Sequence, residues 1–277
     1  MNPDQAAAAD IPAATWMVIG GSGTRACAFP EDARAGARII DKDLVFDTPY
    51  GISPAFKLFE TAGGRRCLTA ELHGWRPGTG RGTASRQLFW VLAQAGVTRI
   101  FSEAGVGSLN PLLDPRDIVI PDDFVDLTTH RDPTPVAGGH LLIMRDPVCP
   151  ALGRALTEAA AEHARGRVFG RGTCVVTEGP RFESRAEIKM MQPFGDIIGQ
   201  SMCPEVWLAR DIGACYAALY LVVNYAEGVV RDWEHLLLAE IFEQDAINQS
   251  RILLSALDAV DAGQPCSCAS LRKPTLF

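Results

Sequence analysis

The chain has 277 residues, of which 47% are hydrophobic and 21% charged, and its formal net charge at pH 7 is −7. This composition is typical of a globular protein, and the negative charge argues against a broad nucleic-acid-binding surface. No apolar run reaches the roughly 20 residues of a membrane-spanning helix, and the opening MNPDQAAAADIPAA does not resemble a secretory signal peptide. We therefore expect a cytoplasmic protein with a small-molecule ligand and no membrane partner, in which residues 1–14 are a disordered lead.

Two kinds of segment alternate along the chain. Short runs rich in β-branched residues predict strands at 16–19, 66–71, 98–103, 117–120, 173–177, 196–199 and 216–223. Apolar residues at a spacing of 3.6 predict helices at 84–96, 150–164, 184–191, 204–212 and 236–261. This alternation predicts an α/β fold with a central, largely parallel or mixed sheet, in one domain over residues 15–262.

Two segments fall outside this pattern. Residues 127–146 are rich in Pro, Gly and His, which predicts a long functional or intersubunit loop. Residues 263–277 resemble a tail.

Most of the eight cysteines lie in apolar stretches, which indicates buried free thiols in a reducing compartment. Cys266 and Cys268 stand apart in the polar tail, where they could form a redox pair, a weak metal clip or an exposed pair without function. Because no histidine is near them, we do not expect a zinc site.

Four polar turns follow predicted strands. They are GGSGT at 20–24, SEAGVGS at 102–108, TEGPRFE at 177–183 and GQSMCPE at 199–205. Ligands of open α/β sheets bind outside the carboxyl ends of the strands, so these turns should converge on one pocket. Backbone N–H groups of such glycine-rich turns can hold a phosphate, although a plain turn has the same composition.

The order and content of six segments resemble the trimeric purine nucleoside phosphorylase and methylthioadenosine phosphorylase family, from about residue 18 to residue 260. These segments are IGGSG, DTPYG, AGVGSLNPLLDPRDIVIPDDFVD, TEGPRFESRAE, DIIGQSMCPEVWLAR and CYAALYLVVN. The resemblance implies a mixed, partly barrelled sheet flanked by helices, a homotrimer, and no metal or organic cofactor. It also implies phosphorolysis, in which inorganic phosphate as co-substrate attacks C1′ of a nucleoside and the free base leaves.

Such a reaction needs a group that holds phosphate against C1′ and a group that stabilises the departing base. The resemblance assigns the phosphate to Ser22, His73, Ser201 and the backbone N–H of Gly105. Ser22 and His73 also count among the expected catalytic residues. Each serine could instead be a turn or cap residue.

Three positions depart from the family pattern. Leu72 stands where a phosphate-binding arginine is expected, Ala104 replaces a hydroxyl or amide residue, and Gln200 replaces a methionine near the ribose. The loss of an arginine removes a charge-assisted grip, which Arg76 or Arg81 could restore. We expect Leu72→Arg to improve phosphate binding. Two alternatives stay open: a nucleoside hydrolase or repurposed biosynthetic enzyme, and a nucleoside-binding protein without catalysis.

The base-binding residues follow from the same resemblance. Phe182 matches an aromatic residue that packs on the purine. The carboxylate of Glu183 can accept a hydrogen bond from N1–H of a 6-oxopurine, and Asn224 can bond N7 and O6 and so stabilise the leaving base. Family members that act on 6-aminopurines carry Asp at the position of Asn224. A 6-oxopurine nucleoside is therefore the expected substrate.

The sugar end is set by two further residues. Leu238 matches a histidine of the members that take unmodified ribose, which favours an apolar 5′ substituent such as methylthio. A shifted register would put His235 there instead, and the leucines could also simply pack the helix. Glu205 matches a residue near the ribose hydroxyls, or it could cap its helix.

Overall fold

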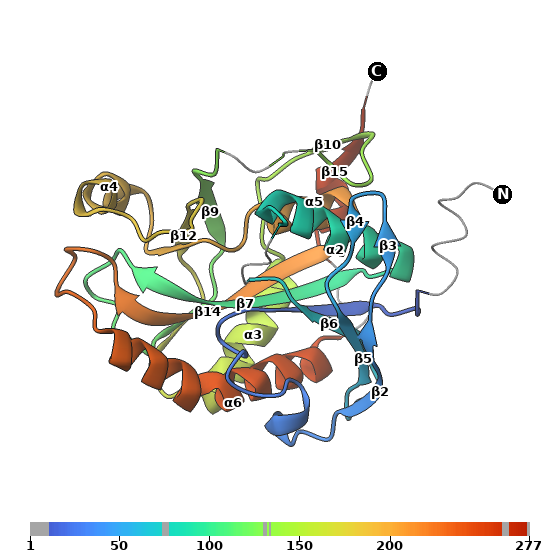
Figure 1. Cartoon of the computed structure of the whole chain (residues 1–277), viewed down its shortest axis with the longest axis horizontal. Coiled ribbons are helices and arrows are strands. Elements are labelled where there is room, and N and C mark those ends of the chain that lie inside the picture. Colours follow the sequence, from blue (N-terminus) through green and yellow to red (C-terminus); the bar gives the residue numbers. More distant parts are fainter. Residues whose placement is uncertain (1–10, 74–77, 130–131, 133, 262–265, 276–277) are drawn as a thin grey trace.

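The computed structural model describes residues 11–73, 78–129, 132, 134–261 and 266–275. Within them, an eleven-stranded mixed sheet forms the centre of the molecule (Figure 1). Its strands are β1 (Trp16–Gly20), β2 (Arg38–Leu44), β5 (Phe56–Glu60), β6 (Arg66–Glu71), β7 (Arg99–Ser108), β8 (Ile118–Val119), β9 (Asp123–Asp126), β11 (Val168–Phe169), β12 (Thr173–Val176), β13 (Ile197–Gly199) and β14 (Cys215–Tyr225). Two small sheets pair β3 (Asp47–Thr48) with β4 (Gly51–Ile52) and β10 (His140–Leu142) with β15 (Arg272–Pro274).

The helices pack on the two faces of the sheet. They are α2 (Arg81–Ala95), α3 (Pro150–His163), α4 (Arg185–Met191), α5 (Glu205–Asp211) and α6 (His235–Ala259). In Figure 1, α3 and α6 lie side by side below the sheet, and α2 and α5 lie above it. Three short 3₁₀ turns are η1 (Glu31–Ala33), η2 (Gln192–Phe194) and η3 (Cys268–Leu271). The predicted α/β class with a mixed sheet in a single domain is confirmed.

The centre of the sheet consists of parallel strands. The order along the main path is β11-β8-β14-β7-β1-β6-β5-β2. Strands β14, β7, β1 and β6 run parallel to one another, and the flanking β8 and β5 pair antiparallel with β14 and β6. Central strands of this kind are covered on both faces, so they are nearly continuous apolar runs. In β14 all residues after Cys215 are buried. Their carboxyl ends therefore point to one edge, where the site forms.

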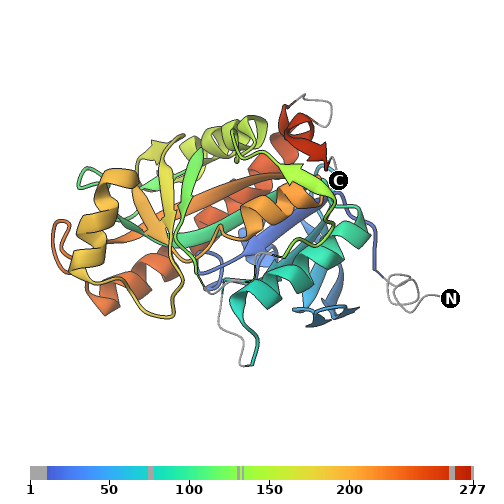
Figure 2. The same cartoon turned by 90° about the horizontal axis from the view of Figure 1, so that it is seen from above.

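A branch of the sheet extends this edge. The end of β7 pairs antiparallel with β13, and β13 leads to β12 and β9 (Figure 2). The turns after β12 and β13 thereby lie beside the ends of β7 and β14. In β14 the pairing register with β7 shifts between Val222 and Asn224. Such a bulge re-aims the side chains that follow it.

One of the predicted turns is part of a strand. Residues 102–108 lie inside β7, because Gly105 and Gly107 allow close packing here rather than a turn. A Cβ on Gly105 would lie 2.6 Å from the Phe242 ring. Glycine inside a strand often marks such a close approach. Strands β2 and β5 were not predicted, since the mostly exposed, charged RIIDKDL of β2 shows no apolar run.

Both the predicted loop and the predicted tail contain ordered structure. Within residues 127–146, β10 pairs with β15, and the Asp211 carboxylate accepts the N–H groups of Val136, Ala137 and Gly138 at 2.7 to 2.9 Å. Instead of trailing away, the chain from Cys268 onward forms η3 and β15. Of the predicted lead, residues 1–10 lie outside the described residues, and Ala14 is buried. In the described part of the chain, no helix has the length and apolarity of a membrane span.

Candidate functional site

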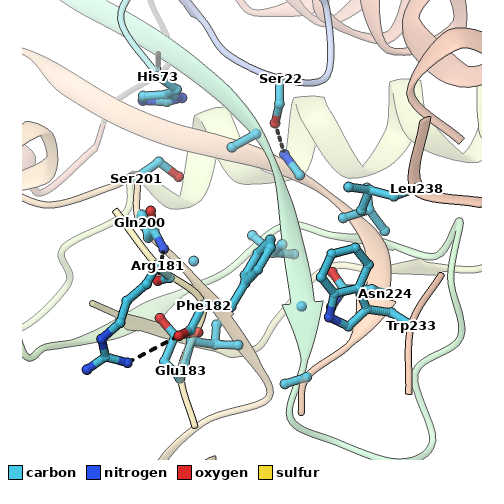
Figure 3. A pocket seen from close by; sticks show the side chains of 18 of the residues that line it. Ser22, His73, Arg181, Phe182, Glu183, Gln200, Ser201, Asn224, Trp233 and Leu238 are labelled. Carbon is cyan, nitrogen blue, oxygen red and sulfur yellow. Dashed lines mark hydrogen bonds between the residues drawn. The ribbon is translucent and has the colours of Figure 1, made fainter. Parts of the chain in front are cut away.

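A cavity of about 380 Å³ lies at the carboxyl ends of the central strands (Figure 3). All four polar segments that were predicted to converge contribute to its wall. They supply, among others, Ser22, Gly105, Phe182, Glu183, Gln200 and Ser201. His73, Asn224 and Leu238 complete the set of expected residues that line it. Of the predicted site residues, only Glu205 lies outside the lining.

The N–H groups of the glycine-rich turn after β1 bind a carboxylate of the protein itself, that of Glu103. The Glu103 carboxylate is fully buried and accepts hydrogen bonds from the N–H groups of Gly21, Gly23 (2.9 Å) and Thr24 (3.1 Å), and from the Thr24 hydroxyl (2.7 Å). A Cβ on Gly23 would collide with this carboxylate. The expectation that these N–H groups are free for a phosphate is therefore wrong: they fix the turn onto β7.

This arrangement predicts that Glu103 is needed for stability. In Glu103→Gln, an amide NH₂ group replaces one of the oxygens that face the N–H donors of the turn. We expect the free energy of unfolding to fall by about 1–3 kcal/mol, because buried donors lose their acceptor. Thermal unfolding followed by circular dichroism measures the loss. An unchanged unfolding temperature would contradict the role of Glu103, and Glu158→Gln at an exposed position of α3 serves as the control.

The tip of the turn points Ser22 into the cavity. The Gly105 N–H donates to Ser22 Oγ at 2.9 Å, so this N–H is engaged in the structure rather than free. Ser201, which is 4% exposed, lies with its Oγ 3.3 Å from the Tyr220 hydroxyl, to which it donates. Figure 3 shows Ser22, Ser201 and His73 at the same end of the cavity. We call this the hydroxyl end.

His73 is held by two oxygen acceptors. Its Nδ1 lies 2.7 Å from the Glu103 carbonyl oxygen, and its Nε2 lies 2.9 Å from Glu205 Oε2. The fully buried Glu205 carboxylate also accepts from Arg81 Nη2 (3.2 Å) and the Met202 N–H (3.1 Å). Glu205 therefore anchors His73 and Arg81 and does not line the sugar site as expected.

Arg81 supplies a cation at the hydroxyl end. Its guanidinium lines the cavity and donates from Nη1 to the Leu72 carbonyl at 2.9 Å. Arg81 is the first residue of α2 and one of the two arginines expected to be able to replace the charge missing at position 72. Arg76 lies outside the described residues.

The Leu72 side chain is packed in the core with 2% exposure, away from the cavity. This corrects the expectation that Leu72→Arg improves phosphate binding. The substitution would instead bury an unpaired charge, which destabilises a protein strongly.

The opposite end of the cavity carries aromatic and amide groups. The Phe182 ring is 53% exposed and meets Trp233 edge to face, with centroids 5.0 Å apart. The Glu183 carboxylate accepts the Thr177 hydroxyl. Asn224 is 7% exposed and donates from Nδ2 to the Tyr225 carbonyl at 2.7 Å. We call Phe182, Glu183 and Asn224 the purine end, after the base expected there. Asn224 lies just after the register shift of β14, and Phe182 and Glu183 lie between β12 and α4.

A third part of the wall is apolar. Leu238 lies there beside Trp233 and Phe242, whereas His235 is exposed and outside the lining. The structure therefore places the leucine, not the histidine, at the cavity. Gln200 also lines it and donates to the Arg181 carbonyl at 2.9 Å.

Several lining residues were not singled out from the sequence. Val106 and Val223 lie within the quoted segments AGVGS and YLVVN, whereas Glu227, Trp233 and Phe242 lie in segments without a motif. Trp233 donates from Nε1 to Glu227 at 2.8 Å, which fixes the ring. An aromatic residue inside the charged stretch RDWEH was the available signal.

The chain matches a family model described as the phosphorylase superfamily over residues 16–258. It is 36% identical over 258 residues to the S-methyl-5′-thioadenosine phosphorylase of Mycolicibacterium smegmatis, covering 90% of this chain and 93% of that one. It is 32% identical over 273 residues to a probable 6-oxopurine nucleoside phosphorylase of Thermococcus kodakarensis, covering 92% and 96%. A methylthioadenosine phosphorylase from an Antarctic soil metagenomic library has a similar structure, with a TM-score of 0.76 and 28% identity over 94% of this chain and 91% of that one. A family match over nearly the whole described domain agrees with the cavity geometry, and the chain belongs to the phosphorylase superfamily.

Proposed function

We propose that this protein cleaves purine nucleosides by phosphorolysis and releases a free base and a pentose 1-phosphate. One observation supports this more than any other. A single cavity joins a hydroxyl end, with Ser22, His73 and Arg81, to the purine end, with Glu183 and Asn224. The first end suits a phosphate dianion, and the second suits the edge of a purine.

The two ends have complementary tasks in the reaction. A phosphate oxygen attacks C1′ while the C1′–N9 bond breaks. The electron pair of the breaking bond stays with the departing base. Arg81 and the hydroxyls of Ser22 and Ser201 orient the phosphate, which removes much of the entropic barrier. Asn224 hydrogen-bonds the base as its negative charge develops, so its interaction is stronger in the transition state than in the ground state. Inorganic phosphate is the co-substrate, and the proposed reaction uses no organic cofactor.

Phosphate dependence tests this function. The purified protein is incubated with inosine and with 5′-methylthioinosine, with and without phosphate, and free base and sugar phosphate are both measured. We expect base release to require phosphate and to saturate with it, with one sugar phosphate formed per base. Equal release in phosphate-free buffer would support the hydrolase, and binding without release would support the non-catalytic protein.

The apolar wall predicts a preference at the 5′ position. Leu238 lies beside Phe242 and Trp233, where a methylthio group would gain apolar contact and a hydroxyl would lose hydrogen bonds to water. We expect Leu238→His to shift the kcat/KM ratio of 5′-methylthioinosine to inosine about tenfold toward inosine. The exposed Leu236→His is the matched control and should leave the ratio unchanged. An equal ratio in wild type and Leu238→His would contradict this assignment.

We also propose that the enzyme is a cytoplasmic homotrimer. Two observations support an interface at residues 127–146: the resemblance to trimeric enzymes, and the bonds by which the Asp211 carboxylate holds residues 136–138. Exposed Leu127 and Leu141 add apolar surface to this segment. Light scattering coupled to gel filtration should give three times the mass of the chain. A stable monomer at micromolar concentration would contradict it.

A further inference from the structure

Four cysteines from three distant parts of the chain meet at the amino end of β14. Cys149 directly precedes α3, Cys215 is the first residue of β14, and Cys266 and Cys268 belong to the C-terminal segment. The four Sγ atoms all lie within 4.8 Å of one another. Asn224 is nine residues further along β14, so this cysteine cluster is separated from the purine end by roughly 30 Å. The cluster therefore plays no part in the site described above.

The backbone holds the cluster together independently of the thiols. The Cys149 N–H donates to the Tyr216 carbonyl at 2.8 Å, which ties the start of α3 to β14. On the other side, β15 pairs with β10, and Arg272 Nε donates to the Asp211 carbonyl at 2.8 Å. Cys149 and Cys268 are buried, while Cys266 lies at the surface. The expectation that Cys266 and Cys268 stand apart in a polar tail is therefore wrong.

The start of α3 suits negatively charged sulfur ligands. Cys149 immediately precedes this helix, and the backbone N–H groups of Ala151 and Leu152 bond to its sulfur. A helix N-terminus stabilises a neighbouring negative charge such as that of a metal-bound thiolate.

We propose that Cys149, Cys215, Cys266 and Cys268 bind one structural Zn²⁺ ion. Four thiolates that surround one point are the ligand set of closed structural zinc sites, and soft sulfur ligands exclude Mg²⁺ and Ca²⁺. With Zn–S bonds of about 2.3 Å, the sulfur atoms of a tetrahedral site lie about 3.8 Å apart. Cys215 and Cys266 have Sγ atoms 3.4 Å apart, and the whole cluster fits within 4.8 Å. Binding is not a redox step: one Zn²⁺ replaces the four thiol protons, which are released to solvent.

Zinc at this position would lock the C-terminal segment onto the body of the protein. Cys266 and Cys268 would be joined to the start of α3 and of β14, and η3 and β15 follow directly after them. Because β15 pairs with β10, the metal would also stabilise the segment 127–146. Its role is therefore structural, and the absence of an open coordination position agrees with this.

Metal content gives the first test. The full chain, purified under reducing conditions without added metal, should contain about one zinc per chain by mass spectrometry of the elements. Reduced apoprotein should bind Co²⁺ with the intense visible absorption of tetrahedral cobalt thiolates, and Zn²⁺ should remove that absorption. Reduced protein that takes up neither ion would overturn the proposal. So would a mass lower by four hydrogen atoms, since that shows two disulfides in place of the metal.

Two variants test whether zinc is bound by the four cysteines of the cluster or by other cysteines of the chain. Cys266→Ser removes the exposed ligand, so the fold should tolerate it, and zinc affinity should fall on the order of a hundredfold. Cys27→Ser is the matched control: Cys27 lies outside the cluster and contacts Ser250, and the variant should keep one zinc per chain. A chelator should lower the unfolding temperature of wild type and of Cys27→Ser but not of Cys266→Ser. Equal zinc content and affinity in the two variants would overturn the assignment.

Discussion

Replacement of Arg81 by leucine is expected to lower kcat/KM for phosphate about a hundredfold, while KM for the nucleoside changes less than about threefold. Arg81 lines the cavity and donates to the Leu72 carbonyl, and in the proposed function its guanidinium takes the place of the arginine missing at position 72. A charge-assisted hydrogen bond to an anion contributes about 1.5–3 kcal/mol, which corresponds to this loss. Initial rates at varied phosphate and saturating nucleoside measure it.

Two controls separate phosphate binding from damage to the fold. Arg81→Lys keeps the charge but loses the planar fork, so we expect it to recover part of the phosphate affinity. Arg38→Lys changes an exposed arginine on β2 and should leave both substrates unaffected. In Arg81→Leu, Glu205 keeps His73 and the Met202 N–H as partners, so the protein should still fold. A nucleoside KM that rises as much as the phosphate KM would contradict the assignment.

Local sequence patterns predicted the helices closely. The expected helix at 150–164 is α3 (Pro150–His163), and the expected helix at 184–191 is α4 (Arg185–Met191). Helix ends are encoded nearby: Ser184 and Glu187 form a reciprocal capping box at the start of α4. The seven expected strands are also present, because buried parallel strands are apolar throughout.

Strands at the margins escaped prediction for a physical reason. An exposed strand such as β2 carries charges on both faces. Its pairing with β5 depends on tertiary contacts, so the local sequence does not predict it. The short strands β3, β4, β9, β10, β11 and β15 lack the runs of β-branched residues that predicted the equally short β8 and β13. In β7, Gly105 suggested a turn although its missing side chain makes room for Phe242 on α6.

The candidate site, too, has features that the sequence predicts and features that it does not. The segments that carry Ser22, Phe182 and Ser201 were predicted to converge, because the carboxyl ends of neighbouring strands share an edge. The partners of charged groups were not predictable. Glu103 fills the glycine turn, and Glu205 joins His73 to Arg81, through contacts between residues about eighty or more positions apart. The cysteine cluster is a further case, since its members meet only after the C-terminal segment has docked.

The purine end predicts a large preference between bases. Inosine- and guanosine-type nucleosides should be cleaved roughly ten- to several-hundred-fold faster, in kcat/KM, than matched adenosine-type nucleosides. Their N1 carries a proton that the Glu183 carboxylate can accept, whereas N1 of adenine carries none. Adenine would therefore place two acceptors against each other inside the cavity, and leaving such a group unpaired costs about 1–3 kcal/mol. Thr177 holds one Glu183 oxygen, so the carboxylate has little freedom to turn away.

Two variants show which residue sets this preference. Asn224→Asp should shift the kcat/KM ratio toward 6-aminopurines, because a protonated carboxyl group can donate to N7 while its other oxygen accepts from the 6-amino group. The shift should be partial as long as Glu183 remains, and Glu183→Gln combined with Asn224→Asp should carry it further, since the amide can donate to the unprotonated N1. Asn248→Asp, on α6 and outside the cavity lining, should leave the ratio unchanged. The measurement compares inosine with adenosine, each with and without a 5′-methylthio group. If wild type preferred the adenosine analogues, Glu183 and Asn224 would not select the base in this way, and the purine end would have to bind its ligand through the aromatic rings of Phe182 and Trp233 alone.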